Sequence, residues 1–312
     1  MSIVRRIFPS DIDALRPRLA CEITPAGVLA ARPGPVTEAG HAQDVVTQFA
    51  PLRIGVLEPD LKAPAMTDRA AVSAAIGQAL EPIAERAKKV TVVVPDAAVR
   101  VLLLDFDTLP AKAVDVLPIL RFRLRKLVHF DVEDAAISWQ VLPKNGDEPV
   151  VRTVVAVMPA GVRAEYEDAV REAGYEPGAV LSSSLAALAA VSGDDPVLVV
   201  NRNANCITTA IARGPQLLLF RTIDLGESGN GEAGETQTVA ELQQTVSVAM
   251  AYYEDTLSST AHTIYSVGPG GAAELERLLE LPGVRVRDLI PSRDNNGALA
   301  GMLAPVVGAL AS

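Results

Sequence analysis

The stretch from residue 109 to residue 142 constrains the fold of this chain more than any other. Apolar residues recur in it at the spacing of one helix face: Leu117, Leu120, Leu124 and the Leu127–Val128 pair. This spacing predicts a helix with a single apolar stripe. Residues 136–141 then predict a strand. The pattern thus indicates a helix that leads into a strand.

The second half of this predicted helix is basic, although the chain has a formal net charge of -10. Its cations are Arg121, Arg123, Arg125 and Lys126. One interpretation is an ordinary surface helix before an edge strand, and spacing alone favours it. The other is an element that docks a partner, because a basic island on an acidic protein attracts acidic groups. Spacing does not decide between them.

The composition sets outer bounds on the function. A chain of 312 residues is long enough for two packed domains, and 49% hydrophobic with 21% charged residues is typical of a globular protein. The sequence pI of about 4.9 argues against nonspecific binding of nucleic acid, which needs a cationic face. The two cysteines do not make a disulfide framework and indicate a reducing compartment.

The termini favour a cytoplasmic protein. The opening residues lack the apolar core of a signal peptide, and residues 297–311 are too short and too rich in Gly and Pro to span a membrane. We therefore expect a cytoplasmic location, with membrane association only through partners.

Strands and helices are predicted to alternate along the rest of the chain, with no internal repeat visible in the sequence. The predicted strands are 19–23, 28–31, 90–94, 101–104, 150–158, 197–200, 207–212, 216–220 and 263–267. The predicted helices are 67–88, 162–173, 180–191, 239–257, 272–280 and 297–310. Residues 31–51 predict a loop or a loosely paired edge strand, and Ser192–Pro196 a hinge.

The stretch from residue 109 to residue 142 resembles the PilM family of type IV pilus assembly proteins. Four pieces carry the resemblance: Leu109-Pro110, Leu120-Arg121-Phe122, His129-Phe130-Asp131 and Trp139-Gln140-Val141-Leu142. The likeness extends more weakly over most of the chain. It implies an α/β, actin-like (RNase H-like) two-domain fold, related to the cell-division protein FtsA and to the cytoplasmic part of the secretion protein GspL.

The resemblance also implies a division of the chain. Domain one would span 1–194, with a small α/β subdomain inserted at about 105–158. Domain two would span 195–290, and residues 291–312 would form a closing helix that packs back on domain one. Only about a dozen residues separate Leu225-Gly226 from the helix that starts at Val239, so domain two is expected to lack its own inserted subdomain.

In actin-like folds the first hairpin carries a phosphate loop of the type Asp-x-Gly. Here Glu22-Ile23-Thr24-Pro25 occupies that place, so Glu22 and Thr24 are its candidate nucleotide contacts. No glycine follows Glu22 two residues later, and Pro25 has no amide hydrogen to donate to a phosphate. This loop is a poor match.

The other two nucleotide loops differ in quality. The second would read Asp-x-Gly, but the chain has Asn201, Asn203 and Asn205 there, and an asparagine cannot supply the carboxylate that holds Mg²⁺ through water. The third loop is well preserved, with Gly268, Gly270 and Gly271 on the adenosine side. A Gly-rich turn between a strand and a helix is common for packing reasons alone.

One good loop out of three argues against catalysis. No other enzyme constellation is visible, because the three histidines are scattered and neither cysteine has the spacing of a metal ligand or a nucleophile. We therefore expect a protein that is not an enzyme and has no cofactor. ATP with Mg²⁺, binding to the degenerate site, is the alternative.

The resemblance implies a peptide partner. In the PilM family the cytoplasmic tail of the membrane protein PilN lies in a groove between the first domain and its inserted subdomain. The residues expected to line that groove are Leu117, Leu120, Arg121, Phe122, Leu124, Val128 and Phe130. Some of them are expected to belong to the core of the subdomain instead.

These observations predict a non-catalytic cytoplasmic adaptor of type IV pilus assembly. It would bind the tail of a PilN-like inner-membrane protein and contact other platform or motor proteins. One alternative is a PilM-like ATPase whose partner affinity is switched by ATP. A second is a GspL-like component of a type II secretion platform, which the absence of a membrane span in the sequence speaks against.

Overall fold

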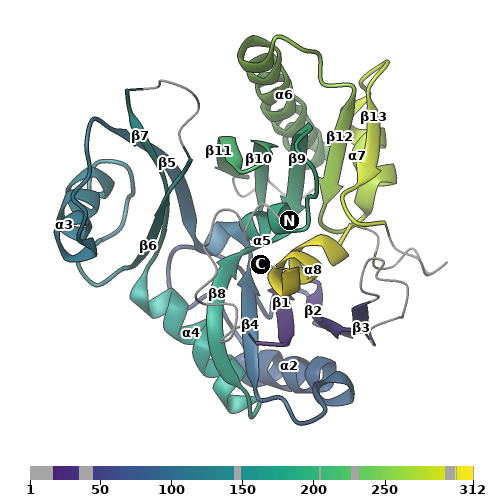
Figure 1. Ribbon diagram of the computed structural model, residues 1–312. Helices are drawn as coiled ribbons and strands as arrows, with labels where there is room; N and C mark the ends of the chain where they lie inside the picture. Colours follow the sequence, from purple (N-terminus) through teal and green to yellow (C-terminus); the bar gives the residue numbers. More distant parts are fainter. Residues whose placement is uncertain are drawn as a thin grey trace.

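The part of the chain that the structure describes forms two five-stranded sheets and one three-stranded sheet, surrounded by helices (Figure 1). The computed structural model describes residues 17–34, 45–143, 149–203, 205–225, 232–291, 299 and 301–311. Within these ranges, no helix combines the length and the apolar character that crossing a bilayer would require.

The first five-stranded sheet has the order β3-β2-β1-β4-β8. Three strands form an antiparallel meander and two continue it in parallel: β1 (Leu19–Thr24), β2 (Gly27–Pro33), β3 (Val45–Pro51), β4 (Lys89–Val94) and β8 (Glu176–Ser182). Every residue of β1 is buried, as expected for a central strand covered on both faces.

The second five-stranded sheet repeats this plan with the order β11-β10-β9-β12-β13. Its antiparallel meander is β9 (Pro196–Asn203), β10 (Cys206–Arg213) and β11 (Gln216–Asp224). Two parallel strands follow, β12 (Thr263–Val267) and β13 (Arg285–Asp288). The chain thus contains a structural repeat that its sequence does not reveal.

Helices cover the outer face of each sheet. α2 (Arg69–Ala84) and α4 (Ala160–Glu172) pack on the first sheet, while α6 (Glu232–Leu257) and α7 (Gly271–Leu279) pack on the second. We call the first sheet with α2 and α4 the first unit, and the second sheet with α6 and α7 the second unit. α2 begins as predicted, because the Asp68 carboxylate accepts a hydrogen bond from the Ala71 amide at 3.0 Å.

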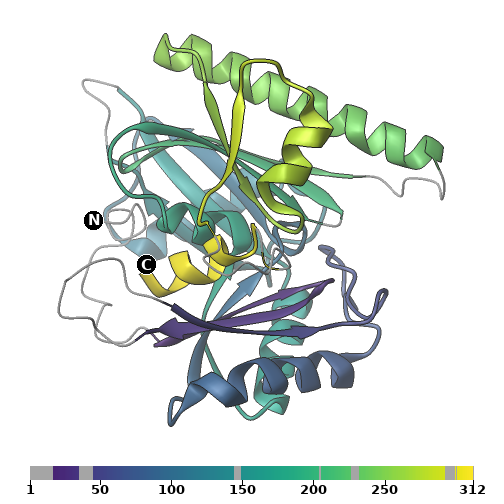
Figure 2. The same ribbon diagram turned by 90° about the vertical axis from the view of Figure 1, so that its right-hand side faces the viewer.

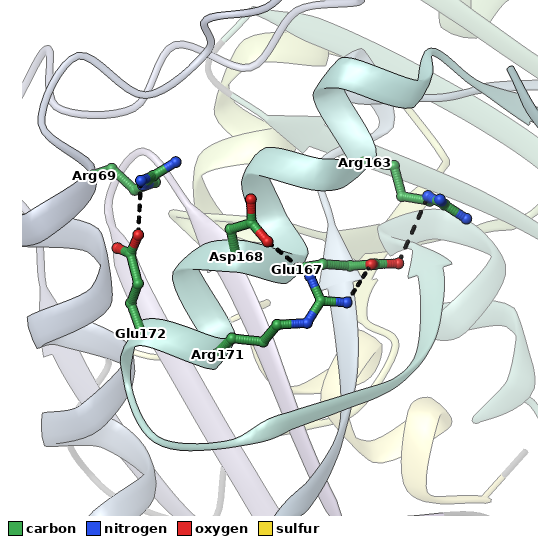
Figure 3. Close-up of polar contacts among 6 residues, drawn as sticks. All are labelled: Arg69, Arg163, Glu167, Asp168, Arg171 and Glu172. Atoms are coloured by element: carbon green, nitrogen blue, oxygen red, sulfur yellow. Dashed lines mark hydrogen bonds and ion pairs between the residues drawn. The ribbon is translucent and has the colours of Figure 1, made fainter. Parts of the chain in front are cut away.

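Charged side chains join the two outer helices of the first unit (Figure 3). Along α4, Arg171 contacts both Glu167 and Asp168 at 2.7 Å, and Arg163 lies 3.7 Å from Glu167. Between the helices, Arg69 of α2 contacts Glu172 of α4 at 2.7 Å. The Arg69–Glu172 pair therefore links α2 to α4 over the sheet that both helices cover.

Two short helices lie between the two sheets (Figure 2). They are α5 (Ser183–Ala189) and α8 (Leu303–Ala311), and they pack closely because Gly308 brings the α8 backbone against the Ala186 carbonyl. α8 buries Leu303, Val306 and Ala309 against the first sheet. Residues 292–298, part of the predicted closing segment, lie outside the described residues.

The third sheet, with strand order β5-β7-β6, lies between β4 and α4 in the sequence and is called the insertion here. Its elements are β5 (Arg100–Phe106), α3 (Ala113–Leu124), β6 (Ala136–Val141) and β7 (Val151–Met158). β5, predicted to lie before the inserted subdomain, pairs with β7 along its whole length and so belongs to it. β9 begins the second unit at Pro196, and the predicted domain boundaries at 194 and 290 stay predictions.

The insertion uses both faces of its sheet. α3 covers the face turned away from the rest of the molecule (Figure 1), and Leu120 and Leu124 fill the core between them. On the other face, Val101 and Val154 share a core with residues of α5 and the second sheet. An ion pair between Arg100 of β5 and Asp224 of β11 adds to this contact. The insertion therefore packs against the second unit.

Two predicted elements differ from the structure. Residues 180–191 were predicted as one helix, but the chain continues as β8 to Ser182, because the edge of β4 offers hydrogen-bond partners there, and α5 starts only at Ser183. α3 ends at Leu124, whereas its apolar stripe continues to Val128. Val128 lies in an irregular segment that still buries its side chain in the insertion's core.

Candidate functional site

The two hairpins predicted to carry phosphate loops are both tight turns. Thr24 pairs with Gly27, so two residues form the turn of the β1–β2 hairpin. The Thr24 hydroxyl donates a hydrogen bond of 2.9 Å to the Gly27 carbonyl. In the second unit, Asn203 pairs with Cys206 across the equivalent β9–β10 hairpin. The polar group of Thr24 is therefore engaged by its own turn.

Between the two sheets, five buried polar residues from four elements contact one another. They are Glu22 of β1, Asp96 after β4, Ser183 and Ser184 of α5, and Asn201 of β9. We call this set the interface cluster. Only Asn201 comes from the second unit, and all five side chains are at least 95% shielded from solvent. The cluster therefore contains Glu22 of the first predicted nucleotide loop and Asn201 of the second.

Hydrogen bonds connect the whole cluster. The Ser183 hydroxyl donates to Glu22 Oε1 at 2.6 Å, and the Ser184 hydroxyl donates to Asp96 Oδ2. The Ser184 amide also donates to Asp96 Oδ1, at 3.1 Å. The Asn201 amide nitrogen lies 3.0 Å from both serine hydroxyl oxygens and 3.3 Å from Asp96 Oδ2. Each carboxylate is thus held by a hydroxyl, and Asn201 contacts both hydroxyls.

Burial changes the protonation of Glu22. It raises the pKa of the Glu22 carboxyl from 4.5 to about 8; the Ser183 hydrogen bond lowers it in part, and the charge of Asp96 raises it further. Burial, with a smaller effect of Glu22, also raises the pKa of the Cys21 thiol to about 12. Glu22 is therefore mainly protonated at neutral pH, and Cys21 is an unreactive thiol.

The amide of Asn201 has one atom without a partner. Its Oδ1 is buried and accepts no hydrogen bond, and it lies on the side of Gly268. The described residues contain no group of three or more His, Cys, Asp or Glu side chains that could hold a metal ion. The structure thus brings Glu22, Asn201 and Gly268 together at one place.

The Gly-rich loop after β12 is in contact with the protein's own backbone. The Gly268 amide donates to the Gly301 carbonyl at 2.9 Å, and a Cβ on Gly301 would overlap the Gly268 carbonyl. Arg202 donates to the Pro269 carbonyl at 3.1 Å and pairs with Glu274 at 2.8 Å. The segment before α8 therefore covers the turn that was predicted to face adenosine.

The remaining predicted nucleotide residues do not converge on this site. Asn205 donates a hydrogen bond to the Pro59 carbonyl of the first unit, and Asn203 ends β9 in its hairpin. Gly270 has a positive φ and its Cα faces the Glu274 side chain, while Gly271 starts α7.

Sequence reasoning did not assign a site role to Asp96, Ser183 or Ser184. Each had a detectable local signal. Asp96 follows a valine-rich strand, and the serines open a short helix that is otherwise alanine and leucine. A polar side chain at the end of a buried strand or at the start of a buried helix requires a partner, although the sequence does not say which one.

The predicted groove residues of α3 divide into core and surface. Leu120, Leu124 and Val128 are buried in the core of the insertion, so they do not line a groove, because β5 and β7 cover them. Leu117 and Arg121 are half-buried, and Phe130 packs partly on the same core. Phe122 alone among the seven is well exposed, at 58%, with the Lys126 ammonium 5.0 Å from its ring centre.

Two further apolar side chains on this surface were not predicted. Leu127 is 49% exposed and Val114 is 73% exposed, although Leu127 follows the helical spacing of the buried residues. α3 ends before Leu127, and this turns its side chain outward. Val114, Phe122 and Leu127 are therefore the large apolar side chains that the segment from α3 to Leu127 exposes among the described residues.

Comparison with known proteins places the fold. No protein-family model matches the sequence. No curated protein matches it either. Among solved structures, the chain is similar to a chain of a "PilM-PilN type IV pilus biogenesis complex", with a TM-score of 0.67 and 18% identity over 94% of this chain and 98% of that chain.

A second similar structure is the cytoplasmic domain of EpsL, an inner-membrane component of the type II secretion system of Vibrio cholerae. Its TM-score is 0.50, with 14% identity over 94% of both chains. These likenesses, together with the repeated sheet plan, confirm the predicted fold class and the resemblance to PilM at the level of the fold. The chain therefore has an actin-like, two-domain α/β fold that is similar to the fold of a chain of the PilM–PilN complex.

Proposed function

We propose that this protein is a non-catalytic adaptor of a type IV pilus system, which binds the cytoplasmic tail of a PilN-like inner-membrane protein. The observation that carries the proposal is the likeness, over nearly the full length of both chains, to a chain of a PilM–PilN complex. On this proposal the protein works in the cytoplasm and reaches the inner membrane through that partner.

The contacts at the predicted nucleotide loops support a role without catalysis. The Asn201 amide nitrogen faces Asp96 and two hydroxyls, whereas a Mg²⁺ ion would need oxygen ligands around it. Gly301 packs on the turn at Gly268. Because these groups already contact each other, the residues present do not fit Mg²⁺ with a nucleotide, and we propose no ATP hydrolysis.

The outside of the insertion, and not a groove between it and the first unit, is the surface that we propose for the peptide, because α3 faces away from the rest of the molecule. Phe122 offers an exposed ring beside half-buried Leu117 and Arg121 on α3. An aromatic ring flanked by an apolar side chain and a guanidinium suits a short peptide with apolar and acidic or carbonyl groups.

The test is a titration followed by fluorescence anisotropy. The labelled probe is a peptide of the N-terminal cytoplasmic segment of the membrane-spanning protein encoded beside this gene. We expect saturable binding that Mg-ATP does not change and that Phe122→Ala weakens about tenfold or more, as for a buried aromatic contact. Ile54→Ala is the matched control, since Ile54 is a fully exposed apolar residue of the first unit.

The outcomes separate the proposal from its alternatives. Binding that requires Mg-ATP would replace the adaptor by an ATP-switched protein. Absence of binding to this peptide, but binding to the cytoplasmic segment of a type II secretion component, would favour a GspL-like role. Equal loss of affinity in the Phe122 and Ile54 variants would move the binding surface away from α3.

A further inference from the structure

The interface cluster is the place where polar groups of the first unit meet a polar group of the second. Glu22 lies in β1 and Asp96 follows β4, both strands of the first sheet. Ser183 and Ser184 start the helix between the sheets, and Asn201 comes from the second sheet. We propose that this cluster is an interdomain latch, which holds the two units in one arrangement without any nucleotide and is closed by Asn201.

Asn201 closes the latch because its side-chain amide donates to oxygen atoms of the other residues that face it. Its amide nitrogen has three oxygen atoms within 3.3 Å: two serine hydroxyls and one Asp96 oxygen. The two hydroxyl protons are already directed at Glu22 and Asp96. The serine oxygens therefore act as acceptors toward Asn201, and its two amide hydrogens satisfy them.

The same geometry explains why residue 201 is an asparagine. A carboxylate there would be a third acidic group, placed within about 3 Å of acceptor oxygens whose protons are committed elsewhere. It would also face the Asp96 carboxylate at the distance of the present hydrogen bond. The latch therefore cannot form with an aspartate at position 201. This residue can serve nucleotide binding or the latch, but not both.

Other contacts around the interface cluster agree with a single arrangement. Asn205 of the β9–β10 hairpin donates to the Pro59 carbonyl, and Arg100 of the insertion pairs with Asp224 of β11. The backbone of α8 packs against that of α5 at Gly308. The latch thus lies among polar and packing contacts that oppose opening, and the buried position of Asn201 makes its loss costly.

The latch can be tested by measuring the distance between the units. Spin labels are attached to cysteines introduced at Gln78 of α2 and Gln244 of α6, which are both exposed, while the native Cys21 and Cys206 are buried and stay unlabelled. Pulsed dipolar spectroscopy on the full chain is expected to give one narrow distance. Adding Mg-ATP is expected to leave that distance unchanged.

Variants at residue 201 then separate the latch from simple destabilisation. Asn201→Asp is expected to add a second, longer distance at neutral pH. That distance is expected to fade as the pH is lowered toward about 4, because the introduced carboxyl then becomes protonated and burial raises its pKa above the ordinary value of about 3.9. Asn201→Ala, which loses the donors and adds no charge, is expected to show a smaller and pH-independent population of the longer distance. Circular dichroism checks that both variants fold.

Two results would overturn the latch. One is a broad or two-peaked distance distribution in the spin-labelled protein with an unchanged cluster, which becomes narrow when Mg-ATP is added. The nucleotide would then hold the two units together. The other is an Asn201→Asp protein with the same narrow distance as its parent. Should that variant not fold, Ser184→Ala takes its place, and it is expected to show the longer distance as well. Peptide binding by the insertion is measured separately, so failure of the adaptor proposal leaves this test intact.

Discussion

The first and second units have the same strand order but differ in what joins their strands to their helices. After β4, the first unit contains the whole insertion before α4 begins at Ala160. After β12, the second unit passes directly through the turn at Gly268–Gly270 into α7. The sheets are thus the constant part of the repeat, and the connections differ in both length and chemistry.

The equivalent strand ends also contribute different groups to the interface. β4 is followed by Asp96, whose carboxylate joins the interface cluster. β12 is followed by Gly268, which contributes backbone packed against Arg202 and Gly301. The difference teaches that one side of the interface depends on charge and hydrogen bonds, and the other on close approach of backbones. Four predictions test this contrast.

The largest effect is expected at the glycine turn of the second unit. Gly268→Ala places a Cβ against the Arg202 carbonyl at a residue with φ of +105°. Backbone strain and overlap together are expected to lower the free energy of unfolding by about 3 kcal/mol or more. Urea denaturation measures it. Gly283→Ala is the control, since Gly283 has φ of +84° with open space around it, and it is expected to cost only about 1 kcal/mol.

The next effect concerns the insertion, which only the first unit has. Leu120→Ala removes a fully buried side chain from its core and is expected to cost about 2–5 kcal/mol of stability. Phe122→Ala, two residues away and exposed, is expected to change stability by about 0.5 kcal/mol or less. Thermal unfolding compares the two. A similar loss in both variants would contradict the division of α3 into a core face and a surface.

The charged side of the interface is expected to respond to pH. The pKa of Glu22 is about 8 in the folded state against an ordinary 4.5, so the folded protein binds more protons than the unfolded chain between these values. This residue's contribution to stability is therefore present below about pH 4.5 and declines as pH rises toward 8, by up to about 1.4 kcal/mol per pH unit.

Glu22→Gln is the matched variant for that prediction. It keeps an acceptor for Ser183 and removes the titration, so its stability is expected to fall less steeply with pH than that of the parent. The titratable groups near Glu22 are Asp96, the other carboxylate of the cluster, and the thiol of the adjacent Cys21. Urea unfolding of both proteins between about pH 5 and 8 gives the two slopes. Parallel slopes would show that Glu22 is ionised in the folded state.

The smallest effect is expected on the outer surface of the first unit. Arg171→Ala removes two contacts along α4 that are shown in Figure 3, but the side chains of Arg171 and Asp168 are about half exposed. The expected loss is about 0.5 kcal/mol at low salt and less at high salt, because solvent screens exposed ion pairs. Thermal melts at two salt concentrations check it. A loss that salt leaves unchanged would indicate a packing role for the Arg171 side chain.

Local pattern predicted individual elements well where burial and capping agree. The strand 136–141 is β6, and the cap at Asp68 starts α2. Residues 180–182 were assigned to a helix because the Ala- and Ser-rich sequence allows either structure, and the free edge of β4 decides for the strand. The repeat of the two units was invisible because a sheet order requires apolar strands and turns, and these can differ in every residue.

The candidate site was less predictable than the fold, since its members are distant in the sequence. Ser183 bonds to Glu22 over a separation of 161 residues, and Ser184 bonds to Asp96 over 88. The resemblance to PilM located Glu22, Asn201 and Gly268, but no periodicity marks which polar residues will satisfy them. On α3, one apolar stripe predicted both core and ligand surface. Leu120 is buried and Leu127 is exposed, because the helix ends between them at Leu124.

The position of α8 has a consequence for synthesis on the ribosome. Leu303, Val306 and Ala309 complete a core with Ala20, Leu29 and Val93 of the first sheet. The unit that is translated first therefore cannot bury these strand residues until the last helix has emerged, and the second unit can fold in the meantime. An early-made sheet with an open apolar face is a natural client for chaperones. A fusion that holds α8 in the exit tunnel would keep α8 from packing on the first sheet.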